Sequence, residues 1–191
     1  MDLILASTSP YRKAQLARLS LQFRAVAPRV VEDDWKALAL APEALARSLA
    51  AAKALSLAEQ FPDAVILGGD QLVAFDGEIL GKPGDAEEAR RQLARLAGKT
   101  HDLVTAVAVW ADGNTHEHID IARLKMRHLT PAEIARYVEV DMPIDCAGSY
   151  KLESLGIALF ERIEAADHSA ITGLPLMALS AIFRRIGFLV P

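Results

Sequence analysis

Short apolar runs alternate along the chain with segments whose apolar residues recur every three or four positions. The runs are typical of buried strands, and the periodic segments are typical of amphipathic helices. Strands are predicted at 3–6, 23–27, 65–75, 79–80, 103–110, 116–127 and 157–163. Helices are predicted at 10–19, 42–61, 85–98, 130–140 and 175–186. Because hairpins occur beside helical crossovers, we expect an α/β fold with a mixed central sheet flanked by helices.

Polar residues mark several of the predicted element boundaries. Ser9 followed by Pro10 is typical of a helix start, and Asp85 with Glu88 is close to a capping box. The polar, acidic segment 28–36 is expected to be a loop. Regular helix and strand signals therefore cover most of the chain, with no obvious linker between them.

Length and composition indicate an ordinary globular chain. Its 191 residues suit one domain, or two tightly joined lobes, spanning 1–191. Hydrophobic residues make up 52% and charged residues 24%, as in soluble proteins. The longest apolar runs fall short of the roughly 18 residues that a transmembrane helix needs. We therefore expect no membrane partner.

Charge and cysteine content narrow the possible partners further. The net charge of −4 argues against binding to a nucleic-acid polymer, which requires a basic face. The single cysteine, Cys146, cannot form an internal disulfide. The first residues lack the basic start and long apolar core of a secretory signal, so a cytoplasmic location is expected. A free nucleotide remains compatible, because it needs only a few cations in one pocket.

Asp70 stands out because it interrupts the apolar segment 64–73. A buried carboxylate is costly unless it binds a metal, pairs with a cation or lies at the exposed end of a strand. Gly68 and Gly69 beside it would let a ligand approach the backbone closely. Two interpretations stay open: a functional carboxylate within a buried strand, or a surface residue beyond a strand that stops at Leu67.

Several basic residues offer partners for a phosphate. Ser7, Arg12 and Lys13 lie near a predicted helix N-terminus, where unpaired amides and the helix dipole favour an anion. Lys82 lies in a Gly-Lys-Pro-Gly turn, and Lys53 lies in an alanine-rich helix. Each also has an ordinary structural interpretation, as part of a helix cap, an exposed turn lysine or a lysine that extends to solvent.

Other candidate chemistry is sparse. Glu32, Asp33 and Asp34 could contribute to a hard-cation site, although such acidic clusters are more often simply solvated. His116 and His118 share one face of a predicted strand and could bind a metal or face solvent. Phosphate-cradling and dinucleotide-binding glycine loops are absent, as is a nucleophile-elbow motif. The residues alone therefore give little support to nucleophilic catalysis, and none of the phosphate-binding candidates is decisive separately.

Together these segments resemble the Maf family, also called septum formation inhibitor proteins, which are nucleoside triphosphate pyrophosphatases. The opening LILASTSPYRKAQLARL is similar to the family's strand, Ser-rich turn and basic helix. Single positions that match are Glu32, Lys53 in AAAKALSLA, Asp70 in GGDQ, Lys82 in GKP, and His101 with Thr105. AGSYKLESLGIALFERIE and TGLPLMAL resemble the family's C-terminal blocks. The resemblance runs nearly end to end and implies two lobes around a nucleotide cleft, as in ITPase-like folds.

The resemblance also implies a reaction and its residues. Hydrolysis between the α and β phosphates would give a nucleoside monophosphate and pyrophosphate, with Mg²⁺ or Mn²⁺ as cofactor and a homodimer as the assembly. Catalytic roles are implied for Asp70, Glu32, Lys53 and Lys82, and phosphate binding for Ser7, Arg12 and Lys13. Asp70 would orient or deprotonate the attacking water and, with Glu32, hold the metal.

Three positions resemble the subgroup that acts on 7-methyl-GTP. That subgroup carries an aromatic residue, then Gln, then Glu, where this chain has Tyr11, Gln71 and Glu153. N7-methylation makes guanine cationic, and a cation stacks well on an aromatic ring. The Glu153 carboxylate could accept from the N1 and N2 donors of guanine. The resemblance therefore implies 7-methyl-GTP as substrate and removal of modified nucleotides as the role.

The chain departs from the family pattern at a few places. Tyr11 stands where the subgroup usually has Trp, and Gly69 replaces a small polar residue. Segment 164–169 is less typical. Val31 removes one possible metal contact, for which Asp33 or Asp34 could compensate.

Two other functions stay open at this point. One is a nucleotide-binding regulator of cell division or septum formation whose hydrolysis is weak or vestigial. The other is a phosphate-binding scaffold without metal use. Asp70, Lys53 and Lys82 favour catalysis over the regulator, because a pure sensor would not need a water-activating carboxylate beside the phosphates.

Overall fold

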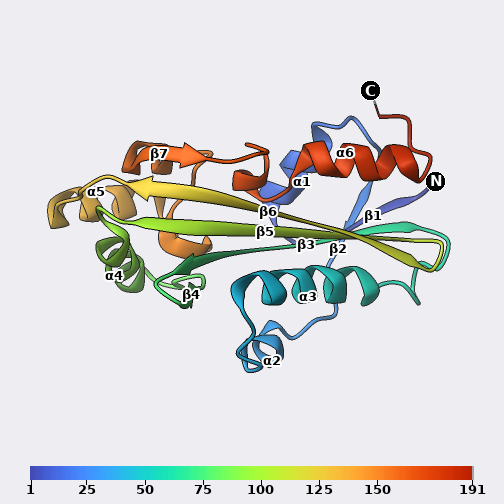
Figure 1. The fold of residues 1–191 in the computed structure, drawn as a ribbon, viewed down its shortest axis with the longest axis horizontal. Helices are drawn as coiled ribbons and strands as arrows, with labels where there is room; N and C mark the ends of the chain where they lie inside the picture. Colours follow the sequence, from blue (N-terminus) through green and yellow to red (C-terminus); the bar gives the residue numbers. More distant parts are fainter. Residues whose placement is uncertain (191) are drawn as a thin grey trace. The chain divides into compact units, whose positions relative to one another are not determined.

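The computed structural model describes residues 1–190, apart from the side chain of Lys36. Pro191, the last residue of the predicted domain, lies outside the described residues. Within them seven strands form one sheet in the order β2-β1-β3-β5-β6-β7, with β4 paired to β3 (Figure 1). The strands are β1 (Leu3–Ala6), β2 (Arg24–Val26), β3 (Val65–Phe75), β4 (Glu78–Leu80), β5 (Thr100–Ala111), β6 (Asn114–Met126) and β7 (Phe160–Glu164). Parallel β2–β1 and β1–β3 pairs beside antiparallel β3–β4 and β6–β7 pairs confirm the mixed sheet.

The helices begin where the sequence predicts them, with one addition. They are α1 (Pro10–Ala17), α2 (Glu32–Lys36), α3 (Pro42–Leu55), α4 (Ala86–Leu96), α5 (Pro131–Asp141) and α6 (Leu176–Arg185). Three short 3-10 helices are η1 (Ala147–Ser149), η2 (Leu155–Leu159) and η3 (Ala170–Thr172). The side chains of Ser9 and Asp85 accept hydrogen bonds from backbone amides of the first turns of α1 and α4, as predicted. No helix in the described part of the chain is long and apolar enough to cross a membrane.

Three element boundaries were predicted wrongly. Segment 28–36 is not only a loop, because α2 forms within it. Three acidic residues in its first turn interact favourably with the positive end of the helix dipole. Helix α3 ends at Leu55 rather than near Phe61, and the Ser56 hydroxyl there donates to the Lys53 carbonyl. The predicted strand 157–163 is shorter, because residues before Phe160 form η2.

The chain divides into two compact units. The first unit comprises Met1–Gln71, Thr105–Asp120 and Asp167–Pro191, and the second comprises Leu72–Val104 and Ile121–Ala166. The unit boundaries fall within or beside β3, β5 and β6, so these long strands contribute residues to both units.

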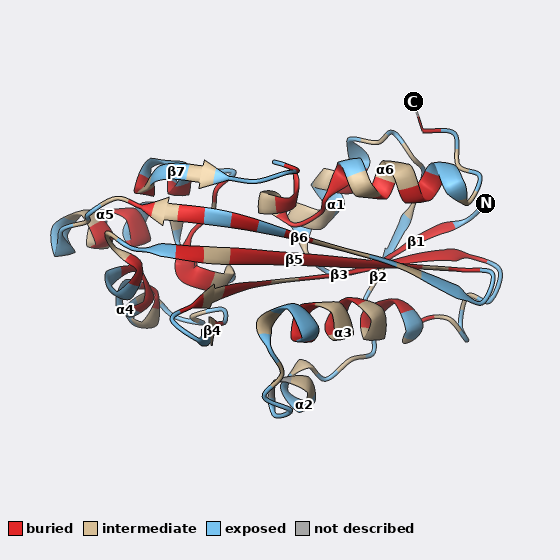
Figure 2. Cartoon of the chain, in the orientation of Figure 1, coloured by how far each residue is buried: buried red, intermediate tan, exposed pale blue. Residues whose placement is uncertain are grey.

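The first unit has helices on both faces of its part of the sheet (Figure 1). On one face, alternate residues of β1, β3 and β5 pack with α1 and α6 in a continuous apolar core. Its central members are fully or almost fully buried, as Figure 2 shows for these strands: Leu3, Leu5, Leu16, Leu67, Val107, Val109, Leu179 and Phe183. Helix α3 covers the other face with buried residues that include Leu45 and Leu49. Because both faces are covered, β3 is buried along most of its length.

Helix α3 comes unusually close to β3 at Gly68. A Cβ atom on Gly68 would lie 2.1 Å from the Ala50 carbonyl oxygen and 2.7 Å from the Ala54 amide nitrogen. Both atoms belong to the α3 backbone and cannot rotate away. The absence of a side chain at Gly68 therefore lets α3 lie directly on the strand two residues before Asp70.

We expect Gly68→Ala to destabilise the protein by about 3 kcal/mol, because the added methyl group must push α3 away from β3. Chemical denaturation measures this loss as a lower midpoint at an unchanged slope. Gly81→Ala is the matched control, since a Cβ there meets nothing within 4 Å. Equal stability of the two variants would contradict the close packing.

Candidate active site

Lys53 lies on the inner face of α3, where its ammonium group joins two carboxylates. Its Nζ atom is 2.7 Å from Oδ1 of Asp70 on β3 and 2.7 Å from Oε1 of Glu32 on α2. Lys53 is 6% exposed and Asp70 is 7% exposed, whereas Glu32 is partly open to solvent. We call Glu32, Lys53 and Asp70 the carboxylate–lysine cluster. Its members come from α2, α3 and β3, and the close packing at Gly68 holds α3 against β3.

The two interpretations of Asp70 are now resolved. Strand β3 continues past Asp70 to Phe75, so the strand does not stop at Leu67 and the surface interpretation is wrong. A buried carboxylate in this position is costly, and the Lys53 ammonium compensates that cost through a charged hydrogen bond. Lys53 likewise does not extend to solvent.

Arg12 adds a second cation beside the cluster. Its Nε atom donates to the Gly173 carbonyl at 3.3 Å, and a Cβ on Gly69 would lie 3.5 Å from that same nitrogen. Burial lowers the pKa of the Arg12 guanidinium, while the charges of Asp70 and Glu32 act in the opposite direction. The guanidinium nevertheless stays charged at neutral pH, because the pKa of arginine starts far above it. The Arg12 guanidinium thus interacts electrostatically with the carboxylates of Asp70 and Glu32.

The Ser-rich turn before α1 serves the helix as well as offering polar groups. Ser7 is buried, and its Oγ atom accepts from the Ser9 amide at 3.1 Å. Ser9 in turn accepts from the Arg12 amide at 3.4 Å as the N-cap. Because Ser7 only accepts in its contact with Ser9, its hydroxyl hydrogen can still be donated to a ligand. Lys13 is exposed on the first turn of α1.

The predicted base-reading residues fall in both units. Tyr11 is half-buried on α1, and Gln71 is half-buried on β3 directly after Asp70, both in the first unit. Glu153 is exposed over part of its surface in the second unit, and desolvation of its carboxyl group raises its pKa. Lys82 is also in the second unit, exposed in the loop between β4 and α4. The structure thus brings together Glu32, Lys53 and Asp70 with Arg12, all within one unit.

His101 occupies an aromatic cluster of the second unit. It is 3% exposed, and its Nε2 atom lies 2.9 Å from the Tyr150 hydroxyl, with Phe160 packed against both rings. Burial lowers the pKa of His101 to about 4, so the ring is neutral at neutral pH. His101, which matches the family pattern in the sequence, thus contacts Tyr150, three positions before Glu153 in the chain.

The cluster suits a divalent cation that is shared with phosphate oxygens. Mg²⁺ in phosphate-processing sites commonly uses one or two carboxylates and takes its other ligands from phosphates and water. Glu32 and Asp70 supply two carboxylates around one point, and the Lys53 ammonium balances one of their two negative charges. Among residues 1–190 no group of three or more His, Cys, Asp or Glu side chains gathers into an all-protein metal site. The residues therefore fit a cation bound together with substrate.

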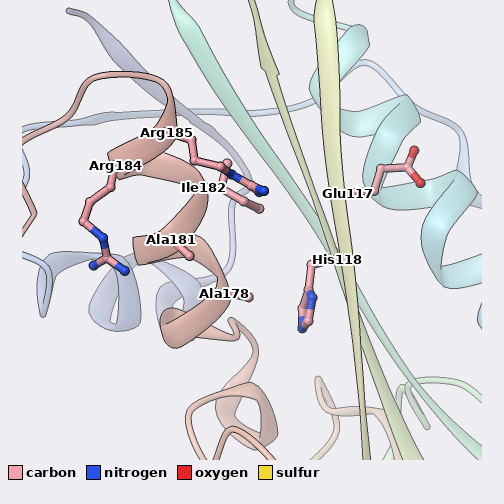
Figure 3. Close-up of a pocket in the computed structure, with 7 residues that line it drawn as sticks. All are labelled: Glu117, His118, Ala178, Ala181, Ile182, Arg184 and Arg185. Carbon is pink, nitrogen blue, oxygen red and sulfur yellow. The ribbon is translucent and has the colours of Figure 1, made fainter.

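A separate hollow lies between β6 and α6 in the first unit (Figure 3). His118, Ile182 and Arg185 line it, whereas the Glu117 side chain points away from α6 and lies 3.9 Å from Arg47. The residues that line it all differ from the predicted catalytic and phosphate-binding residues. We therefore place the candidate site at the carboxylate–lysine cluster and not at this hollow.

Comparison with known proteins relates the whole chain to one family. A family model described as Maf-like protein matches residues 2–186. The 7-methyl-GTP pyrophosphatase of Bdellovibrio bacteriovorus is 51% identical over 95% of each chain. The 7-methyl-GTP pyrophosphatase of Xanthomonas axonopodis pv. citri is 44% identical over 99% of this chain and 98% of its own.

Solved structures show the same fold in a more distant protein. The structure of a HAM1 protein from Coxiella burnetii has a TM-score of 0.52 and covers 97% of this chain and 99% of its own at 14% sequence identity. At that identity the likeness shows the fold alone. The ITPase-like architecture expected from the sequence is thereby confirmed.

Proposed function

This chain belongs to the Maf family, and on that basis we propose that it is a nucleotide pyrophosphatase that hydrolyses 7-methyl-GTP to 7-methyl-GMP and pyrophosphate. The observation that carries the proposal is the 51% identity, over 95% of each chain, to a 7-methyl-GTP pyrophosphatase. The carboxylate–lysine cluster supports it chemically, because a buried acid beside cations suits water activation next to phosphates.

The reaction begins with a water molecule that attacks the α-phosphorus. A new bond forms between the water oxygen and the α-phosphorus, and the bond from that phosphorus to the α–β bridging oxygen breaks. Pyrophosphate leaves with the bridging oxygen. Asp70 orients the water and accepts its proton at a carboxylate oxygen. Lys53 holds Asp70 in place through the 2.7 Å contact.

Charge on the phosphate oxygens is neutralised by this chain's cations. Arg12, Lys13 and the Ser7 hydroxyl bind these oxygens at the start of α1, where the helix dipole adds to the attraction. Lys82 contributes a further ammonium group. Asp70 and Glu32 would hold Mg²⁺ or Mn²⁺, and the bound cation supplies Lewis-acid polarisation of the phosphate oxygens.

The base is read by Tyr11, Gln71 and Glu153. A methylated guanine is cationic, so it stacks favourably on the Tyr11 ring. Its N1 and N2 atoms carry hydrogens, and acceptors at Gln71 and Glu153 complement them. We infer from the family match along 2–186 that both units act as one functional domain. The homodimer and the cytoplasmic location stay predictions.

A substrate panel tests the proposed function. Pyrophosphate release is measured from 7-methyl-GTP, GTP, dTTP and UTP, each with and without Mg²⁺. We expect 7-methyl-GTP to be cleaved fastest and only in the presence of the cation. Nucleotide binding without pyrophosphate release would instead favour the regulator of septum formation, and release that is independent of metal would overturn the role of Asp70 and Glu32 as metal ligands.

We expect Glu153→Gln to lower the preference for 7-methyl-GTP over UTP by about tenfold, because the change keeps the shape of the side chain but removes a charged acceptor. The kcat/KM ratio for the two nucleotides measures the effect. Glu139→Gln, at an exposed position on α5, is the matched control. An unchanged ratio in Glu153→Gln would remove Glu153 from base recognition.

A further inference from the structure

The side-chain amide of Gln71 is held by groups that are distant in the sequence. Its Nε2 atom lies 2.8 Å from the Thr105 hydroxyl on β5 and 2.9 Å from the Ala170 carbonyl oxygen in η3. A longer contact of 3.5 Å reaches the Ile171 carbonyl. Thr105 and Ala170 are each 1% exposed, so water cannot replace these contacts. Gln71 is thus the half-buried end of an otherwise buried network.

The network permits one orientation of the Gln71 amide. The Ala170 carbonyl oxygen can only accept, so the Gln71 atom 2.9 Å from it must be the nitrogen. Thr105 donates its hydroxyl hydrogen to the same carbonyl at 3.0 Å and therefore accepts from Gln71. A rotated amide would set its own oxygen against the Ala170 oxygen, with two lone pairs facing each other. The Gly173 amide also donates to Ala170, which fixes the carbonyl in place.

This orientation leaves the Gln71 carbonyl oxygen, Oε1, as the available atom. Within residues 1–190 no protein hydrogen bond engages it, while both amide hydrogens face the network. A glutamine in solution offers a donor or an acceptor equally well, because its amide can turn over. In this chain it offers only an acceptor.

We propose that Thr105 is a positioning residue for base recognition, which together with the Ala170 carbonyl locks Gln71 so that Oε1 is a fixed acceptor for the base. The inference deepens the proposed function and rests on it for the identity of the base. A fixed acceptor matches the N1 and N2 hydrogens of guanine. It opposes the unprotonated N1 of adenine, which presents an acceptor in the same region of the ring.

Thr105→Val tests the proposal because valine keeps the shape of threonine but can neither accept from Gln71 nor donate to Ala170. Thr105→Ser restores both hydrogen bonds and serves as the rescue. Thr100→Val makes the same change at an exposed position of the same strand and serves as the control. All three are compared with the full-length wild-type protein.

The first measurement is made on the free protein and needs no catalysis. Hydrogen exchange of the Gln71 side-chain amide is followed by NMR, with the signal assigned by its loss in Gln71→Met. We expect exchange at least tenfold faster in Thr105→Val than in the wild type, in Thr105→Ser or in Thr100→Val. Equal exchange in Thr105→Val and the wild type would overturn the proposal.

The second measurement compares binding of 7-methyl-GMP with binding of AMP. We expect the ratio of the two dissociation constants to shift toward AMP by about tenfold in Thr105→Val and to return in Thr105→Ser. An unchanged ratio would overturn the proposal, as would a wild type that does not prefer 7-methyl-GMP. Binding does not require hydrolysis, so a chain that shows these shifts but releases no pyrophosphate would disprove the proposed activity and leave the role of Thr105 intact.

Discussion

Asp70→Asn is expected to lower the turnover of 7-methyl-GTP by about 10²- to 10⁴-fold while the protein stays folded. Asparagine keeps the shape of the side chain but cannot accept the proton of the attacking water or hold a cation with a full negative charge, and general bases contribute rates of this order. The fold tolerates the change because Lys53 keeps its 2.7 Å contact with Glu32. Single-turnover pyrophosphate release measures the loss.

Asp63→Asn is the control for Asp70→Asn, because Asp63 is exposed in the turn before β3. It should retain wild-type turnover and stability. Near-normal pyrophosphate release by Asp70→Asn would rule out Asp70 as the group that activates water. A large loss of stability in that variant would show instead that the carboxylate is mainly structural.

Lys53→Met is expected to give the second large effect, in stability as well as in turnover. Removal of the ammonium leaves the buried Asp70 carboxylate without its partner, and breaking a buried ion pair in this way costs about 3–5 kcal/mol. Turnover of folded protein should fall by at least about 10²-fold, because Asp70 loses the contact that positions it. Denaturant unfolding and pyrophosphate release measure the two losses.

Added Mg²⁺ distinguishes a charge effect in Lys53→Met from a packing defect. A cation that binds between Glu32 and Asp70 replaces the missing positive charge, so Mg²⁺ should raise the melting temperature of Lys53→Met more than that of the wild type. Lys99→Met, at an exposed lysine, should behave like the wild type. An equal Mg²⁺ response in all three proteins would contradict cation binding at the two carboxylates.

Much of the fold could be predicted from local patterns. The apolar run at 65–75 predicted β3 with its observed bounds, and the cap at Asp85 predicted the start of α4. Helix α2 was missed because its five residues carry no apolar periodicity. Acidic residues in a single turn are only a weak sequence signal for a helix. In η2, before β7, Gly156 packs onto the Lys151 backbone, where a Cβ would lie 2.4 Å from the carbonyl oxygen. Sequence periodicity does not report such a contact.

The sequence predicted which residue types form the site, but it did not predict which side chains contact one another. A buried acid at Asp70 demanded a cation, yet several lysines and arginines were possible partners, and the approach of α3 at Gly68 decided for Lys53. The orientation of Gln71 depends on the Ala170 carbonyl, which lies 99 positions away in the chain. Every residue has a backbone carbonyl, so the sequence cannot indicate which one contacts Gln71. This part of the site could be identified only from the structure. For Lys82 and Glu153 the roles rest on resemblance and stay proposals.

Hydrolysis in ¹⁸O-labelled water tests the central claim most directly, because it reports which phosphorus the water attacks. The wild-type protein is given 7-methyl-GTP and a divalent cation, and both products are analysed by mass spectrometry. The account predicts one ¹⁸O atom in 7-methyl-GMP and none in pyrophosphate. Label in the pyrophosphate, or release of orthophosphate in its place, would contradict attack at the α-phosphorus.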